Sequence, residues 1–172
     1  MTAQLLIEFN VLGVPKPEPR PRWDGRKGIY VPSSATPWKH EIRAACKAAM
    51  MRLGWNGVVE PGVPLRAVMV FRMPRPKGHW RTGRHSGKLK PNAPHRHTSK
   101  PDLDNLVKAA LDAIGEFDGC PTLVWADDSQ VDDFGGSCKR YVREGEQPGC
   151  LVSVSAHCPL ENPCSSLGDV LA

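Results

Sequence analysis

The sequence predicts an α+β fold, in which two principal helices pack on one small mixed β-sheet within a single domain. Two segments, 37–53 and 103–114, carry apolar residues at the spacing of a helix. With 172 residues, 40% of them hydrophobic, the chain suits one well-packed core and is too short for two. Short β-like runs complete the pattern and lie at residues 5–12, 64–73, 139–142 and 150–156.

The first strand, 5–12, is stopped by Gly13-Val14-Pro15. Alternate prolines over residues 15–22 then forbid a helix and favour extended backbone. We call residues 15–22 the Pro-Arg arm. Its cations, Lys16, Arg20 and Arg22, are presented on a stiff segment, so little entropy is lost when they contact phosphates. A plain connector is the competing interpretation of this arm.

The first helix is expected to begin with Thr36 as N-cap and Pro37 at the first helical position, and to end at Gly54. The second is expected from Leu103 to Ile114, ended by Gly115 or Gly119. Its predicted buried stripe consists of Leu103, Val107, Ala110, Leu111 and Ile114, with Leu106 beside it. We expect a folded domain over residues 1–156 and a loosely held tail over residues 157–172.

Positive charge is concentrated between Pro61 and Pro101, where the sequence has no Asp or Glu. Residues 74–99 form a long loop without apolar periodicity, which we call the basic loop and expect to be functional or disordered. Such a one-signed segment favours a polyanionic partner, although a solvated loop without a partner would look similar. Together with the cations of the arm, the predicted DNA contacts are Arg75, Lys77, Arg81, Arg84, Lys88, Lys90, Arg96 and Lys100.

Acidic residues gather in two short motifs inside this basic chain of net charge +5. Asp102 precedes the second helix and Asp104 lies in its first turn, sharing a face with Lys108. Asp127 and Asp128 follow an apolar run further along. Clustered carboxylates repel one another, and a bound Mg²⁺ would relieve that repulsion because hard cations prefer oxygen ligands. The motifs therefore predict a metal-dependent nuclease.

Simpler explanations exist for each motif taken alone. Asp at a helix start is a common cap, and an Asp–Lys pair four residues apart is a common surface stabiliser. In the same way, Asp127-Asp128-Ser129 could form a plain turn. A non-catalytic basic DNA-binding protein would show all of these features without cutting DNA.

The run Lys-Pro-Asp-Leu-Asp-Asn-Leu-Val-Lys-Ala-Ala-Leu-Asp-Ala from Lys100, followed by Asp-Asp-Ser-Gln-Val from Asp127, resembles the RusA family of Holliday junction resolvases. The resemblance spans about residues 5–143 and includes the Pro-Arg arm. It implies a homodimeric endonuclease of DNA recombination and repair that uses Mg²⁺, or Mn²⁺ as a substitute, and nicks four-way junctions symmetrically. The metal-binding aspartates of the family map onto Asp102, Asp104 and Asp128, and its essential lysine onto Lys108.

The chain departs from that family in three places. The segment from Ile114 to Trp125 is a few residues longer than usual, and the basic loop and the tail are also long. These departures leave the motifs intact but put dimer geometry and sequence preference in question. A Mg²⁺-dependent nuclease that acts on other branched nucleic acids, such as flaps and forks, is a further alternative.

The remaining signals concern location and cysteine chemistry. No apolar run approaches the roughly 20 residues that span a bilayer, and no secretory signal is visible, so we expect a cytoplasmic protein without a membrane partner. The six cysteines are then expected to be reduced. A zinc site built from Cys150, His157, Cys158 and Cys164 matches no standard spacing and is a distant alternative.

Overall fold

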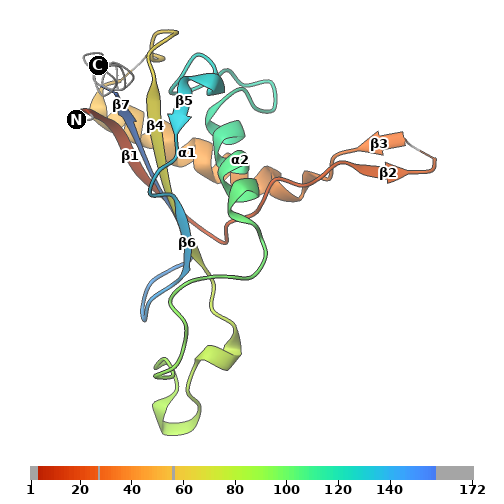
Figure 1. Ribbon diagram of the computed structural model, residues 1–172, viewed down its shortest axis with the longest axis vertical. Helices are drawn as coiled ribbons and strands as arrows, with labels where there is room; N and C mark the ends of the chain where they lie inside the picture. The colour runs from red at the N-terminus through yellow and green to blue at the C-terminus, as the bar shows by residue number, and fades with distance from the viewer. Residues whose placement is uncertain (1–3, 27, 56, 158–172) are drawn as a thin grey trace, which may run out of the picture.

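A computed structural model describes residues 4–26, 28–55 and 57–157 and confirms the predicted α+β class (Figure 1). The two helices are α1 (Thr36–Leu53) and α2 (Leu103–Ile114). The strands are β1 (Gln4–Leu12), β2 (Arg22–Asp24), β3 (Gly28–Tyr30), β4 (Leu65–Met73), β5 (Val131–Asp133), β6 (Cys138–Tyr141) and β7 (Gly149–Ala156). Short 3-10 helices lie at Ser33–Ala35 (η1), Lys77–His79 (η2), Gly83–His85 (η3) and Asp128–Gln130 (η4).

The main sheet is mixed, as predicted. Strand β7 lies between β1 and β4 and is antiparallel to both. Strands β5 and β6 run parallel to β4; β5 pairs with Leu65 and Arg66, and β6 pairs with Val70 to Met73. Strand β5 and the separate two-stranded sheet of β2 and β3 were not predicted, since three-residue strands carry too little periodicity to be recognised in the sequence.

One face of the sheet forms the core with α1 and α2. In β4 every second residue is buried, because successive side chains of a strand point to opposite faces. The buried set is Leu65, Ala67, Met69, Phe71 and Met73. Against it pack Ile7, Phe9 and Val11 of β1, Trp38, Ile42 and Cys46 of α1, and Leu106, Ala110 and Ile114 of α2. No helix in the described part of the chain is long and apolar enough to cross a membrane.

Helix α1 starts differently from the prediction. Thr36 is the first helical residue, and Ala35 occupies the N-cap position without a side-chain cap. The reason is η1, which runs directly into α1 and carries the chain into the helix without a hydroxyl cap. The predicted end is confirmed: Gly54 has a left-handed φ of 63° and its N–H donates to the carbonyls of Met50 and Met51.

Helix α2 has the predicted bounds, but its predicted buried stripe is partly wrong. The buried residues are Leu106, Ala109, Ala110, Ala113 and Ile114, whereas Leu103, Val107 and Leu111 are only half-buried. Apolar residues cover more than one side of this helix, so the spacing alone could not decide which side meets the core. The three alanines are buried together with Leu106 and Ile114, whereas Leu103, Val107 and Leu111 border a cavity.

The basic loop is held by contacts to β6 and the turn that follows it. Arg75 donates to the carbonyls of Val142 and Pro94, at 2.6 and 2.9 Å, and its guanidinium lies 5.2 Å from the ring centroid of Tyr141. Lys139 donates to the carbonyls of Ser99 and Pro101, both at 2.6 Å. The loop therefore has a defined path, and in Figure 1 it extends well beyond the sheet.

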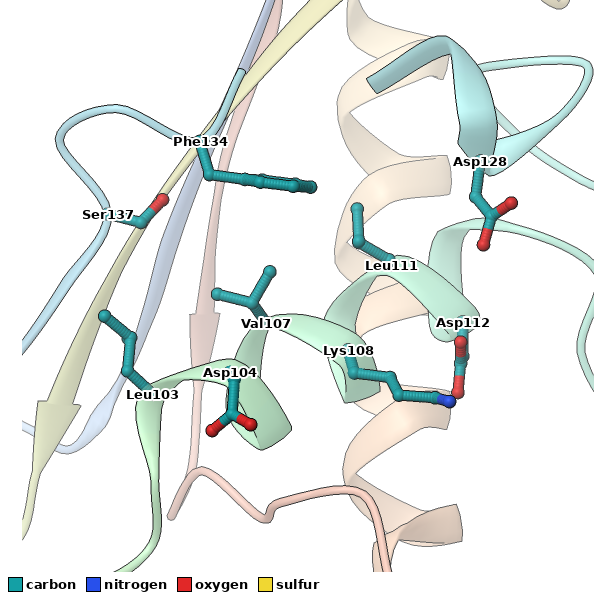
Figure 2. Close-up of a pocket in the computed structure, with 9 residues that line it drawn as sticks. All are labelled: Leu103, Asp104, Val107, Lys108, Leu111, Asp112, Asp128, Phe134 and Ser137. Atoms are coloured by element: carbon teal, nitrogen blue, oxygen red, sulfur yellow. The ribbon is translucent and has the colours of Figure 1, made fainter. Parts of the chain in front are cut away.

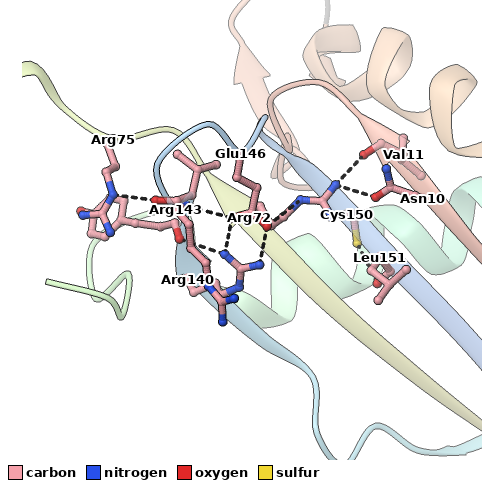
Figure 3. A network of polar contacts seen from close by, with 11 residues as sticks. Asn10, Val11, Arg72, Arg75, Arg140, Arg143, Glu146, Cys150 and Leu151 are labelled. Carbon is pink, nitrogen blue, oxygen red and sulfur yellow. Dashed lines mark hydrogen bonds and ion pairs between the residues drawn. The ribbon is translucent and has the colours of Figure 1, made fainter. Parts of the chain in front are cut away.

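An ion-pair network stands beside the root of this loop (Figure 3). Both carboxylate oxygens of Glu146 accept hydrogen bonds of 2.6 Å from Arg140, and Arg72 lies 3.9 Å from the same carboxylate. Arg72 also donates to Asn10 of β1 at 2.6 Å. The hydrogen bonds from Arg140 are the main reason that the pKa of Glu146 falls to about 2. As an anion, Glu146 thus links Arg140 of β6 to Arg72 of β4, and Arg72 extends the network to Asn10 of β1.

We expect Glu146→Gln to lower the melting temperature at pH 7 and to shrink the loss of stability on acidification. A carboxyl whose folded pKa is about 2, against an ordinary 4.5, stabilises fully above 4.5 and loses that contribution as the pH falls toward 2. Thermal unfolding at pH 7 and pH 3 measures both effects. Glu41→Gln, at an exposed position of α1, is the matched control, and equal acid sensitivity of Glu146→Gln and wild type would contradict the assignment.

A second stability prediction concerns Gly149, at the start of β7. A Cβ atom there would collide with the carbonyl oxygen of Val11 and the guanidinium of Arg72. We therefore expect Gly149→Ala to cost about 1–3 kcal/mol of unfolding free energy, the usual range for overpacking. Chemical denaturation tests this, with Gly78→Ala as the control because a Cβ at Gly78 meets nothing within 4 Å. Equal stability of the two variants would contradict this prediction and would show that β1 shifts to accommodate the added methyl group.

Candidate functional site

The two aspartates of the first acidic motif lie at the start of α2. Asp102 is the N-cap residue with extended backbone, at φ −72° and ψ 148°, and Asp104 lies in the first turn, as the sequence predicts. Both side chains are exposed. The Asp102 side chain makes no capping hydrogen bond, so a capping role does not explain it. Lys108 follows one turn after Asp104 and is also exposed.

A cavity of about 580 Å³ borders α2 (Figure 2). Its apolar lining comes from Leu103, Val107 and Leu111 on α2 and from Phe134 in the turn after β5. Its polar lining brings together both acidic motifs. Asp104, Lys108 and Asp112 come from one face of α2, and Asp128 comes from η4.

A second cavity, of about 680 Å³, lies on the other side of the α2 start. Here the Pro-Arg arm contributes Lys16, Arg20 and Arg22, and the chain before α2 contributes Lys100 and Asp102. Asp102 therefore faces the cations of the arm, whereas Asp104 and Asp128 line the first cavity. The α2 start separates the two cavities and carries a carboxylate toward each.

The neighbours Asp127 and Asp128 differ in what the fold does with them. Asp127 accepts a hydrogen bond of 2.8 Å from the N–H of Ser129 and forms a capping box with Gln130 at η4. Hydrogen bonds from Ser129 also lower the pKa of Asp127. Asp128 is exposed and, among the described residues, belongs to no ion pair. The turn interpretation thus accounts for Asp127 but leaves Asp128 unexplained.

The surface-pair interpretation of Asp104 and Lys108 also lacks support. Within residues 4–26, 28–55 and 57–157, no ion pair joins these two residues, and neither has another charged partner. Among the described residues, the Asp104 carboxylate accepts a single side-chain hydrogen bond, a long one of 3.4 Å from Asn105. Among the described residues, the carboxylates of Asp102, Asp104 and Asp128 and the ammonium of Lys108 therefore form no ion pair.

The carboxylates of Asp102, Asp104 and Asp128 are ligands of the kind that Mg²⁺ prefers, although the three are not close enough together to bind one ion. No group of three or more His, Cys, Asp or Glu side chains in the described chain is close enough to hold a metal ion. Mg²⁺ is commonly bound through one or two carboxylates, with waters and substrate phosphate oxygens completing its shell. Asp104 and Asp128 line the same cavity, and Asp102 is close in sequence to Asp104.

Comparison with protein families decides the affiliation. Residues 13–155 match the family model described as endodeoxyribonuclease RusA. The chain belongs to the RusA family. This confirms the resemblance drawn from the acidic motifs and the arm. No curated protein matches the chain. RusA membership implies the nuclease activity of a Holliday junction resolvase, so the chain is an endodeoxyribonuclease by family.

The structure also reveals a charged cluster in this RusA chain that the sequence analysis missed. The Lys39 ammonium on α1 is buried and lies 2.5 Å from Glu18 of the arm and 3.2 Å from Asp112 of α2. The N–H of Glu18 also donates to the carbonyl of Asn105, at 2.9 Å. The cluster thus fixes the arm against both helices, beside the candidate site. A charged residue directly after the buried Trp38 was the available signal.

The predicted DNA contacts are not equivalent in the RusA fold. Arg75 is engaged with backbone carbonyls and Tyr141, and Arg81 is half-buried. The other predicted contacts are exposed on the arm, the basic loop and the approach to α2: Lys16, Arg20, Arg22, Lys77, Arg84, Lys88, Lys90, Arg96 and Lys100. Arg75 therefore serves the fold of the loop, and the exposed cations form the surface available to a polyanion.

The zinc alternative has little support in the part of the chain that the structure describes. Cys158 and Cys164, and the predicted tail apart from His157, lie outside the described residues. Cys150 is buried in β7, and burial raises the pKa of its thiol to about 12, which disfavours the thiolate that zinc requires. His157 lies 3.3 Å from the carboxylate of Asp132.

Proposed function

We propose that this RusA family member is a Mg²⁺-dependent endonuclease that resolves four-way DNA junctions in recombination and repair. The observation that carries the proposal is a set of charged side chains on α2, at its N-cap and on η4 that form no ion pair among the described residues. Asp102, Asp104, Asp128 and Lys108 have no ion-pair partners in the described chain, and the Pro-Arg arm provides cations next to Asp102.

Each side chain has a role that follows from its charge and position. Asp104 and Asp128 would hold a divalent ion, with Asp102 joining from the α2 start. The bound ion, with Mn²⁺ as a possible substitute, would supply an activated water and stabilise the leaving oxygen. Lys108 would stand as an ammonium beside the scissile phosphate and favour the negative charge that develops on it. The N–H groups at the start of α2 add further positive potential.

DNA would be held by the exposed cations of the arm and the basic loop. Because each phosphate contact releases condensed counterions, Arg20→Ala should weaken binding and reduce the slope of log affinity against log salt by about one. Titration of a junction at several salt concentrations, without a divalent metal, measures that slope. Arg143→Ala, which removes an arginine outside the arm and the predicted contacts, is the control, and an unchanged slope for Arg20→Ala would remove the arm from the DNA surface.

We further propose that the active form is a homodimer acting on DNA in the cytoplasm. Resolution of a junction needs two nicks at symmetry-related positions, and each chain carries one set of the candidate aspartates. A two-fold dimer supplies two such sets in the required relation.

Substrate competition tests the function against its rivals. A labelled synthetic four-way junction should be cut in the presence of Mg²⁺, with linear duplex, flap and fork of the same sequence cut far more slowly. Equal cutting of the flap and the fork would instead favour a general nuclease of branched nucleic acids. Tight binding of all substrates without cutting would favour the non-catalytic DNA-binding protein.

A further inference from the structure

The hairpin of β2 and β3 exposes two large apolar side chains on one face. Trp23 is 74% exposed and Ile29 is 73% exposed. The two residues are direct cross-strand partners, so their side chains share one face of the hairpin. In Figure 1 the hairpin projects away from the sheet and helices. An isolated two-stranded hairpin is marginally stable in water, so this face is expected to gain stability from a partner.

The position of the hairpin relates it to the candidate site. It follows directly from the Pro-Arg arm, and Arg22 belongs to both segments. Arg20 and Arg22 line the same cavity as Asp102. A DNA strand held in that cavity, with a phosphate near Asp102, would therefore continue along the arm toward the hairpin.

The charges around the apolar pair favour nucleic acid as the partner. Arg22 and Arg26 are exposed on the hairpin. The one acidic residue of the hairpin, Asp24, accepts a hydrogen bond of 2.9 Å from the N–H of Arg26. Arg22 precedes Trp23 in β2, so its side chain lies on the opposite face of the hairpin from the apolar pair, and Arg26 lies in the turn after β2. A hairpin with an apolar pair on one face and cations on the other face and in the turn suits a nucleic acid, because stacking and insertion bind the bases while arginine binds the backbone.

We propose that Trp23 and Ile29 pack against bases exposed where the arms of a DNA junction meet, so that the hairpin selects branched over linear DNA. The inference rests on the proposed function, since the hairpin would recognise the crossing point of a DNA junction. In continuous duplex every base pair is stacked on both sides, and insertion must first open a step. At a crossing point the stacking is already interrupted, so the apolar pair finds base faces at a lower cost.

Binding measurements without a divalent metal test the hairpin separately from catalysis. Trp23→Ala should weaken binding to a four-way junction by about 5- to 100-fold, the loss expected for one stacked base, and change duplex affinity less than twofold. Trp23→Phe should restore most of the junction affinity because it keeps an aromatic face. Met51→Ala, which truncates an apolar side chain that is 80% exposed on α1, should affect neither substrate.

Two further readouts make the outcome decisive. A 2-aminopurine base at the crossing point should change fluorescence with wild type and not with Trp23→Ala. Sedimentation should give the same mass for both proteins. Equal losses on junction and duplex would overturn the proposal, and so would a lower mass for Trp23→Ala, which would make the hairpin a contact between copies of the chain. Metal-dependent cutting of a junction by wild type is measured independently, so failure of the hairpin proposal is distinguishable from failure of the proposed function.

Discussion

Asp128→Asn is expected to reduce junction cleavage by at least about 100-fold while leaving junction binding intact. Asp128 is exposed and shares a cavity with Asp104 and Lys108, and no ion pair among the described residues occupies it. Replacing the carboxylate by an amide removes the charge that would hold the metal. Removing a negative charge near DNA should not weaken binding. Single-turnover cleavage and equilibrium binding, measured on the same junction, separate the two effects.

The adjacent Asp127 provides a matched control. Its carboxylate caps η4, and Asn caps as well as Asp does, so Asp127→Asn makes the same change of charge one residue away and keeps the local fold. We expect this variant to retain cleavage within a few fold of wild type. Equal losses in Asp127→Asn and Asp128→Asn would indicate that the total charge of the motif matters, and would contradict a specific role for Asp128.

Lys39→Met is expected to lower the free energy of unfolding by about 3 kcal/mol, toward the low end for breaking a buried ion pair. The side chains of its two partners, Glu18 and Asp112, are 17% and 29% exposed. Without Lys39, each carboxylate would therefore be partly buried and have no cation to pair with. Chemical denaturation measures the loss. Lys47→Met, at an exposed position of the same helix, should cost far less.

A double variant isolates the interaction itself. Adding Glu18→Gln to Lys39→Met removes one of the stranded charges, so the pair should be less destabilised than the sum of the two single variants. Simple additivity would mean that Lys39 stabilises α1 by packing alone. Junction affinity should fall together with stability in Lys39→Met, because the same lysine fixes the arm that carries Arg20.

The fold was predictable wherever a long helix or strand had a clear pattern of apolar residues. The bounds of α2 followed from its apolar spacing and from Gly115, β4 followed from its apolar content, and β7 followed from its alternation. The face that α2 buries did not follow, because Leu103 and Val107 are as apolar as the residues that reach the core. Helix packing favoured the alanines there, and that choice depends on the opposing surface.

The candidate site was predictable in its residue types and only partly in its arrangement. The spacing of Asp102, Asp104 and Lys108 placed them correctly at the helix start. That Asp102 lines the cavity of the arm while Asp104 and Asp128 line the other cavity depends on how η4 and the arm pack, which no local pattern encodes. For the same reason, the position of Lys39 next to Trp38 does not reveal that it joins three segments in one buried cluster.

The most direct test of the account is cleavage of a supercoiled plasmid carrying an extruded four-way cruciform. Paired nicks across the junction convert the plasmid to a linear product, whereas single nicks yield an open circle. The account predicts linear product with Mg²⁺, and none with a chelator or with Asp128→Asn. Binding of the cruciform without any cutting, or equal cutting of a plasmid that lacks it, would contradict the claim that this chain resolves junctions through the aspartates around α2.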